Sequence, residues 1–503
     1  MRRTHPGQSG VIVSGVLWNF LGQGWLLVVA FLATPYIVRT LQVDLYGLYS
    51  LAGFVLSYFA FLEFGLGAAV TKYISQYLAE DNAEGVVTSF WAGLAWLAAG
   101  GLVCVLVVGL LAEGIASSLL HVPARLEASA VVAFRISALI LCVSMLAGLT
   151  GGTLRSAGRF GMVNLTSIVT GTAQTALSVG LLWAGHSLAA ILWGMLVCQG
   201  VLLVWQLGLC LRSLPVLRTP RVTREALTRL LGFGGILTLA SLIGPVLTNV
   251  EKLFMTRLTS VGLLTYYAVP FSLIDRLGVI PSAFGGVLYP SYSYFGAKGP
   301  EHNRELHYRG TLYICASYGF FACFFLFLGR PFLRAWMGVE FADRSAPVLG
   351  ILAIGGLFNA MARPAITALQ GVGKPHIPLV LQIVELVLYL PSAYFLIRGY
   401  GMIGAAEAWS GRVIVDALLL HVASCLELRE TAIVYRRLLK AMALPLATCS
   451  IGFLAIGMSG ASLLGPVAIA GLLITALIYA SVVWTGVLDT QTRERMVAFW
   501  KQA

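Results

Sequence analysis

The chain has 503 residues, of which 58% are hydrophobic and only 11% are charged, and its formal net charge is +12. About a quarter of the residues of a soluble domain are charged, so this composition excludes an ordinary soluble enzyme.

Fourteen apolar blocks follow one another along the chain, and each is long enough to cross about 30 Å of hydrocarbon as a helix. Backbone groups in lipid must be satisfied within their own segment, which favours helices over strands. The approximate centres of the blocks are Val28, Phe59, Leu102, Leu139, Thr170, Leu196, Leu242, Ser272, Ser317, Gly355, Ile383, Val413, Cys449 and Leu473. The sequence therefore predicts an all-α polytopic membrane protein with about 14 transmembrane helices.

The basic residues are distributed unevenly between the two sides of these blocks. With a cytoplasmic N-terminus, the loop Lys and Arg residues favour the cytoplasmic side by roughly three to one, as the positive-inside rule requires. Both termini are then predicted to be cytoplasmic. The apolar run that follows Arg3 continues to about Val38, which is too long for a signal peptide and predicts a retained first helix. The positive charge reflects topology, so we expect no nucleic-acid partner.

The chain repeats its own plan from its midpoint. The first copy consists of an apolar run, the segment 41–49 and a second apolar run that ends near Tyr73. The second copy has the same order: an apolar run from Leu230, the segment 258–267 and an apolar run that ends at Pro290. Only the second copy carries Glu251, Lys252, Asp275 and Arg276. A duplicated apolar scaffold with charge added at the repeat interface is typical of transporters.

A second repeat has a spacing of 215 residues. It aligns Gly158 with Gly373, Arg159 with Lys374 and Ala190 with Ala405. These matches predict two six-helix bundles, at residues 1–211 and 230–425, joined by a basic cytoplasmic linker at 212–229. Residues 426–503 would add a cytoplasmic loop, two further transmembrane helices and a cytoplasmic tail.

Charged residues inside the spans are the candidate functional groups, because each costs roughly 2.5–3.5 kcal/mol or more to insert. Arg276, in helix eight, is the strongest candidate for a cation that contacts the substrate, although a salt bridge to a neighbouring helix would also explain its presence in the span. Lys252 faces either a cavity or the membrane interface. Glu251 pairs with Lys252 or Arg276, or it binds a coupling proton or sodium ion.

Other polar positions allow both functional and structural interpretations. Arg363 is an isolated charge on helix ten. Arg412 and Asp416 are one turn apart on helix twelve, which favours an internal ion pair. Asn19 and Gln23 share a face of helix one and would either bind sugars or pack between helices.

Helix eight contains Pro281 and Pro290, with Gly285 and Gly286 between them. These residues remove backbone hydrogen bonds and predict a bend beside Arg276. The eight Cys residues show no ligand spacing, so we expect small hydrophobic side chains rather than disulfides or a metal site.

The order and spacing of several short motifs resemble those of the Wzx-type polysaccharide flippases. This family belongs to the MOP superfamily, together with MurJ-type lipid II flippases and MATE antiporters. The segments that carry the resemblance are 45–49, 63–73, 154–160, 261–267 and 369–375. Glu251 stands where the family usually has Asp, which keeps the carboxylate and adds one methylene.

The resemblance implies a flippase of the bacterial inner membrane for cell-surface polysaccharide biosynthesis, such as O-antigen, exopolysaccharide or capsule. It would move undecaprenyl-pyrophosphate-linked oligosaccharide from the cytoplasmic to the outer leaflet by alternating access. Substrate-binding residues are then expected at Arg276, Lys252, Asn19, Gln23 and Arg363. Ion-coupling residues are expected at Glu251, Asp275 and Glu63.

Two other functions remain open at this point. A MATE-type multidrug or cation antiporter would favour acidic and aromatic residues in its cavity. An integral-membrane polysaccharide polymerase or ligase would need a large outer loop, which the chain lacks, and no nucleophile–base motif is visible. We therefore expect no enzymatic activity and no cofactor, with H⁺ or Na⁺ as candidate coupling ions. Membrane lipids and a polysaccharide polymerase or ligase are candidate partners.

Overall fold

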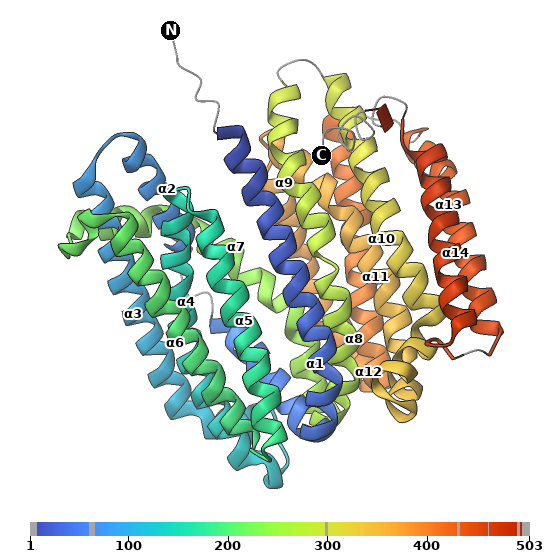
Figure 1. Cartoon of the computed structure of the whole chain (residues 1–503), viewed down its shortest axis with the longest axis horizontal. Coiled ribbons are helices and arrows are strands. Elements are labelled where there is room, and N and C mark those ends of the chain that lie inside the picture. The colour runs from blue at the N-terminus through green and yellow to red at the C-terminus, as the bar shows by residue number, and fades with distance from the viewer. Residues whose placement is uncertain are drawn as a thin grey trace. The chain divides into compact units, whose positions relative to one another are not determined.

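The computed structural model describes residues 8–59, 66–296, 300–429, 433–460, 462–489 and 493–494. Within these ranges all regular secondary structure is helical and no strand occurs, which confirms the all-α prediction (Figure 1). The α-helices are α1 (Gln8–Phe59), α2 (Leu66–Ala79), α3 (Ala83–Gly114), α4 (Ala124–Ser156), α5 (Phe160–Trp183), α6 (Leu188–Ser213), α7 (Arg224–Leu258), α8 (Val261–Arg276), α9 (Val279–Gly296), α10 (Pro300–Met337), α11 (Val339–Gly371), α12 (His376–Leu428), α13 (Ile433–Met458) and α14 (Pro466–Val482).

The helices have the length and composition of membrane spans. Eleven of those in the described ranges are long and apolar enough to cross a bilayer. Each of the fourteen predicted block centres lies within a helix. The chain is therefore a multi-span membrane protein, as predicted.

The helix α12 contains two crossings rather than one. Its 53 residues would span about 80 Å if straight, but Gly401 adopts a non-helical backbone with φ 59° and ψ −129°. A Cβ at Gly404 would overlap the carbonyl of Leu396, whereas these residues would lie about 12 Å apart along a straight helix. The chain thus folds back at Gly401 into a helical hairpin.

The helix α1 is divided in the same way at Gln42, whose φ is 64°. Before this residue, Gly22 packs against Ile168 of α5. After it, Tyr49 contacts Met195 of α6, the helix that follows α5 in the chain. The helix α1 thus consists of two segments that contact different helices of the first unit.

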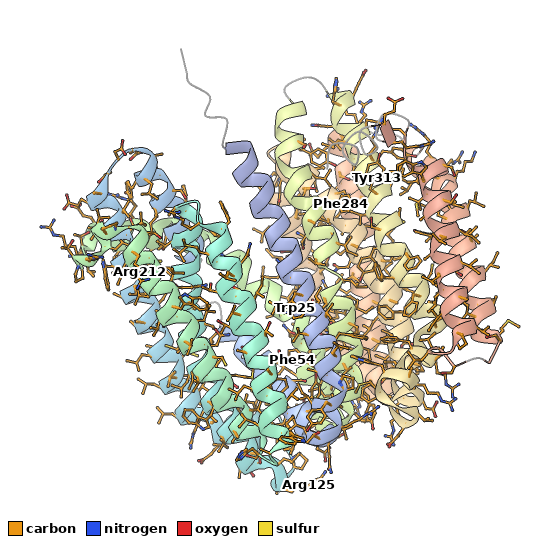
Figure 2. The ribbon with its side chains drawn as sticks, in the orientation of Figure 1. Trp25, Phe54, Arg125, Arg212, Phe284 and Tyr313 are labelled. Carbon is orange, nitrogen blue, oxygen red and sulfur yellow. The ribbon has the colours of Figure 1, made fainter. Side chains whose placement is uncertain are left out.

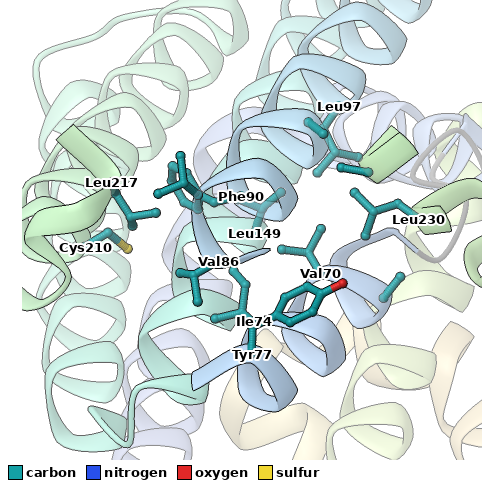
Figure 3. Packing of buried hydrophobic residues seen from close by; sticks show 14 of the residues in the cluster. Val70, Ile74, Tyr77, Val86, Phe90, Leu97, Leu149, Cys210, Leu217 and Leu230 are labelled. Atoms are coloured by element: carbon teal, nitrogen blue, oxygen red, sulfur yellow. The ribbon is translucent and has the colours of Figure 1, made fainter. Parts of the chain in front are cut away.

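The chain divides into two compact units, residues 1–265 and 266–503. In the first unit, a buried apolar cluster joins α2, α3, α4 and α6 to the start of α7, around Val70, Phe90, Leu149 and Leu230 (Figure 3). Arg125 and Arg212 lie toward opposite ends of this unit (Figure 2). The two six-helix bundles joined by residues 212–229 stay a prediction, because the boundary between the compact units reflects contact density and not the sequence repeat.

The repeat with a spacing of 215 residues is visible in the backbone. The helices α4 and α11 both have 33 residues, and their first and last residues are each 215 positions apart. The turns after them contain Gly158 and Gly373, with φ of 73° and 81°, a left-handed conformation that favours glycine. Three backbone N–H to C=O hydrogen bonds recur at this spacing: Ala157 to Thr153, Gly158 to Arg155 and Arg159 to Leu154, then Val372 to Ala368, Gly373 to Gln370 and Lys374 to Leu369.

The two copies of the other repeated segment contact each other within the first unit. The Thr265 hydroxyl donates to the Val43 carbonyl at 2.5 Å. A Cβ at Gly47 would overlap the Val261 carbonyl. Because Val43 and Gly47 align with Val261 and Thr265, the two contacts are equivalent by the repeat. The repeated segments therefore form a symmetric contact that requires glycine at position 47.

We expect Gly47→Val to destabilise the first unit by about 1–3 kcal/mol, because a side chain there would be forced against backbone that cannot rotate away. Thermal unfolding of the purified protein in detergent measures the effect. Gly53→Val is the matched control, since a Cβ at Gly53 meets nothing within 4 Å. Equal melting temperatures for the two variants would show that the contact at Gly47 can relax.

Candidate functional site

Helix eight is interrupted directly after Asp275 and Arg276. The helices α8 and α9 are separated by Leu277 and Gly278. Pro281 has no N–H to donate to the Leu277 carbonyl, which instead accepts from the Ile280 N–H at 3.0 Å. The discontinuity predicted from proline is therefore present beside Arg276, just before Pro281. Interrupted helices commonly form binding sites in transporters.

A cavity of about 280 Å³ opens beside this break, within the second unit. Its polar and aromatic lining comes from α8 to α12 and consists of Asp275, Ser282, Tyr318, Asn359, Arg363 and Trp409. One carboxylate, one guanidinium, an amide and hydroxyl groups thus share a single apolar-walled space. This combination suits a ligand that carries both charge and hydroxyl groups.

Arg363 is the cation of this cavity. Its side chain is exposed, and it forms no ion pair with any residue that the structure describes. A Cβ at Gly285 would lie 3.2 Å from the Arg363 Cδ, so the absence of a side chain there leaves room for the arginine stem against α9. An unneutralised guanidinium with five donor hydrogens is a strong partner for a phosphate.

Two consecutive glycines bring the helices around the cavity close together. A Cβ at Gly356 would overlap the Tyr318 hydroxyl of α10 and lie 2.7 Å from Ile274 Cγ2 of α8. On an adjacent face of α11, about 100° around the helix, a Cβ at Gly355 would lie 2.5 Å from the Ser410 Oγ of α12. The close approach places Asp275, Arg363 and Trp409 around one space. Sequence periodicity does not predict this arrangement, because it depends on contacts between helices.

The first unit holds a separate buried cation. Lys252 is 1% exposed and Glu251 is not exposed at all, and their charged atoms are 3.9 Å apart. The ammonium donates to the Asn249 Oδ1 at 2.5 Å and lies 3.8 Å from the ring centroid of Phe54, which is labelled in Figure 2. The structure thus buries Lys252 among polar and aromatic partners of the first unit.

The other predicted residues are placed as follows. Arg276 is half-buried and does not line the cavity, although Asp275 beside it does, because neighbours in a helix point about 100° apart. Gln23 is exposed on α1 in the first unit. The side chain of Asn19 and the whole of Glu63 lie outside the described residues. The structure therefore brings together two of the predicted residues, Asp275 and Arg363, in one cavity and two, Glu251 and Lys252, in one buried cluster.

Sequence reasoning assigned the wrong partner to Arg412. Its Nη1 lies 3.4 Å from the Glu385 Oε2, and its guanidinium lies 5.3 Å from the ring centroid of Tyr389. Among the described residues it forms no ion pair with Asp416. The hairpin at Gly401 joins Glu385 to Arg412 across the two halves of α12, and helical spacing alone does not show this.

Comparison with known proteins identifies the family. Residues 12–295 match the polysaccharide biosynthesis protein family, which is more than half of the chain. The chain belongs to this family. It is also 25% identical over 413 residues to the "Putative O-antigen transporter" of Shigella flexneri, covering 82% of this chain and 97% of that protein.

Solved structures of MOP superfamily transporters share the fold of this family member. The lipid II flippase MurJ in an inward closed conformation has a TM-score of 0.70 at 12% identity, covering 93% of this chain and 98% of MurJ. An inward-facing multidrug resistance MATE family transporter has a TM-score of 0.64 at 15% identity, covering 82% and 94%. A MOP superfamily transporter from Pyrococcus furiosus has a TM-score of 0.60 at 16% identity, covering 84% and 96%. At these identities the likeness shows a shared fold.

Proposed function

We propose that this family member is a flippase that moves undecaprenyl-pyrophosphate-linked oligosaccharide from the cytoplasmic to the outer leaflet of the bacterial inner membrane. Membership of the polysaccharide biosynthesis protein family carries the proposal. The name of the Shigella flexneri relative and the fold shared with a lipid II flippase support it. Both termini would be cytoplasmic, and the protein would work by alternating access between its halves.

The chemistry of the cavity in the second unit fits such a cargo. The guanidinium of Arg363 would hold the pyrophosphate through charge-assisted hydrogen bonds. Asn359 and Ser282 would donate to and accept from sugar hydroxyls, and the indole of Trp409 would cover an apolar sugar face. No covalent bond is made or broken, so these groups bind and orient the cargo and are not catalytic residues.

The remaining predicted charges would serve the same transport cycle. Lys252 and Arg276 would contact the anionic headgroup in other conformations, with Asn19 and Gln23 binding sugars. Asp275, Glu251 and Glu63 would be the carboxylates that take up a coupling proton or sodium ion. No cofactor is needed, and a polysaccharide polymerase or ligase would receive the transported unit.

A second candidate function is export of an organic cation. Asp275, Tyr318 and Trp409 line the same cavity, and one carboxylate beside two aromatic rings suits a cation. The fold shared with a MATE transporter agrees with this alternative. Arg363 opposes it, because a guanidinium in the same cavity repels a cationic ligand.

In cells that depend on this protein for surface polysaccharide, we expect its deletion to leave lipid-linked oligosaccharide in the inner leaflet. Cell-surface polysaccharide and the lipid-linked intermediate are quantified in parallel, and the intact gene should restore export. Normal surface polysaccharide in the deletion strain, together with a gain in sensitivity to cationic drugs, would favour the antiporter instead.

A further inference from the structure

We propose that a second cavity, of about 690 Å³, binds the phosphate group of a membrane lipid. It lies in the second unit, between the end of α10, the start of α11 and the connection from α13 to α14, with α13 beside α10 in Figure 1. We call it the Arg330–Arg334 cavity after its two arginines. It shares no lining residue with the cavity around Arg363.

The charges of the Arg330–Arg334 cavity leave one guanidinium available for an anion. Arg330 donates from Nε and Nη2 to the same oxygen of Asp343, at 3.1 and 2.7 Å. Arg334, one turn along α10, is exposed and forms no ion pair within the described part of the chain. The two arginines and one aspartate therefore give the cavity a net positive charge, and a bound phosphate would accept hydrogen bonds from Arg334.

The far wall of the cavity can approach a phosphate closely. It is formed by Gly457, Gly460, Ser462 and Leu463, which offer a hydroxyl group, two glycines without side chains and one apolar side chain. Gly460 has a φ of 65°, which turns the chain out of α13. The end of α13 and residues 460, 462 and 463 after it thus line the cavity together with the two arginines.

Apolar side chains around the cavity favour a lipid over a soluble anion. Val339, which lines it, is 53% exposed. Met458, at the end of α13, and Leu464, on the connection to α14, are each next to a lining residue and are 78% and 74% exposed. A basic pocket bordered by exposed apolar side chains matches an amphipathic ligand, with its phosphate in the pocket and its chains along Met458 and Leu464.

The proposed topology indicates on which side of the membrane this site lies. With both termini cytoplasmic, the end of α10 lies on the outer side, so the ligand would be a lipid phosphate of the outer leaflet. Its source is either the polyprenyl phosphate carrier or a bulk anionic phospholipid. Only this assignment of side and source depends on the proposed function, because the pocket chemistry holds for either.

Native mass spectrometry of the purified full-length protein tests the site. Every sample carries Arg363→Gln, which weakens phosphate binding at the proposed cargo site, so that retained lipid reports on the Arg330–Arg334 cavity. We expect one phosphatidylglycerol or undecaprenyl phosphate molecule to be retained, and diacylglycerol, which lacks the phosphate, to be lost. Arg334→Gln should lower retention roughly tenfold or more through loss of a charge-assisted hydrogen bond. Preference for undecaprenyl phosphate would identify the carrier, and equal retention would identify the bulk headgroup.

Two further variants separate phosphate binding from a structural role of the arginines. Asp343→Asn frees Arg330 and should raise retention, whereas a purely structural ion pair predicts no gain. Arg344→Gln is the control, because Arg344 pairs with Glu340 and does not line the cavity. Equal retention of diacylglycerol, or unchanged retention in Arg334→Gln, would overturn the proposal. Neither result requires transport to be measured, so the proposed function would stand or fall separately.

Discussion

Replacement of Arg363 by Gln is expected to slow export of the lipid-linked oligosaccharide strongly while leaving the protein folded in the membrane. The side chain lines the cavity in the second unit and has no ion-pair partner among the described residues, so its removal leaves no buried charge uncompensated. A charge-assisted hydrogen bond to a phosphate contributes about 1.5–3 kcal/mol, which corresponds to a loss of roughly 10- to 100-fold in cargo affinity. Transport rate against cargo concentration, measured in proteoliposomes, reports this loss.

Two controls make the Arg363 result specific. Arg363→Lys keeps the positive charge but not the planar fork, so it should retain part of the activity. Arg398→Gln removes an exposed arginine of α12 that does not line the cavity, and it should transport normally. Normal transport by Arg363→Gln would show that this cavity is not the cargo site.

Replacement of Lys252 by Met should have the largest effect on stability. Glu251 and Lys252 are both fully buried and lie 3.9 Å apart, so the variant leaves a carboxylate without the ammonium beside it. Removal of one partner of a buried pair costs about 3–5 kcal/mol, and thermal unfolding in detergent should shift down by on the order of 10 °C.

The double variant Glu251→Gln with Lys252→Met distinguishes a structural pair from a substrate contact. It removes both charges, so it should recover most of the lost stability. If the pair also contacts the cargo, transport should stay low in the restored protein. A single Lys252→Met variant that melts like the wild type would show that Glu251 does not depend on this ammonium.

The sequence predicted the parts of the fold that depend on composition and periodicity. All fourteen block centres lie in helices, and the spacing of 215 residues recurs in the bounds of α4 and α11 and in the hydrogen bonds around Gly158 and Gly373. These features are local, since a hydrophobic block or a glycine turn depends on residues close in the sequence and not on tertiary contacts.

The site was less predictable because its residues meet through tertiary packing. Arg363 and Asp275 were recognised as costly charges, but their shared cavity depends on the close approach allowed by Gly356. Asn359 and Trp409 gave no signal, because a single amide or indole in an apolar helix is common. The partner of Arg412 was missed since the hairpin at Gly401 is a backbone feature that helical spacing does not reveal.

The central claim is that this protein moves a lipid-linked oligosaccharide across the membrane. The most direct measurement is the transfer of undecaprenyl-pyrophosphate-linked oligosaccharide between the leaflets of proteoliposomes that contain the purified protein alone. A sugar-specific reagent that reaches only the outer leaflet reports the transfer. We predict movement above that in protein-free liposomes, and its loss in the Arg363→Gln variant. Movement no faster than in protein-free liposomes, in a sample that exports an organic cation, would contradict the account.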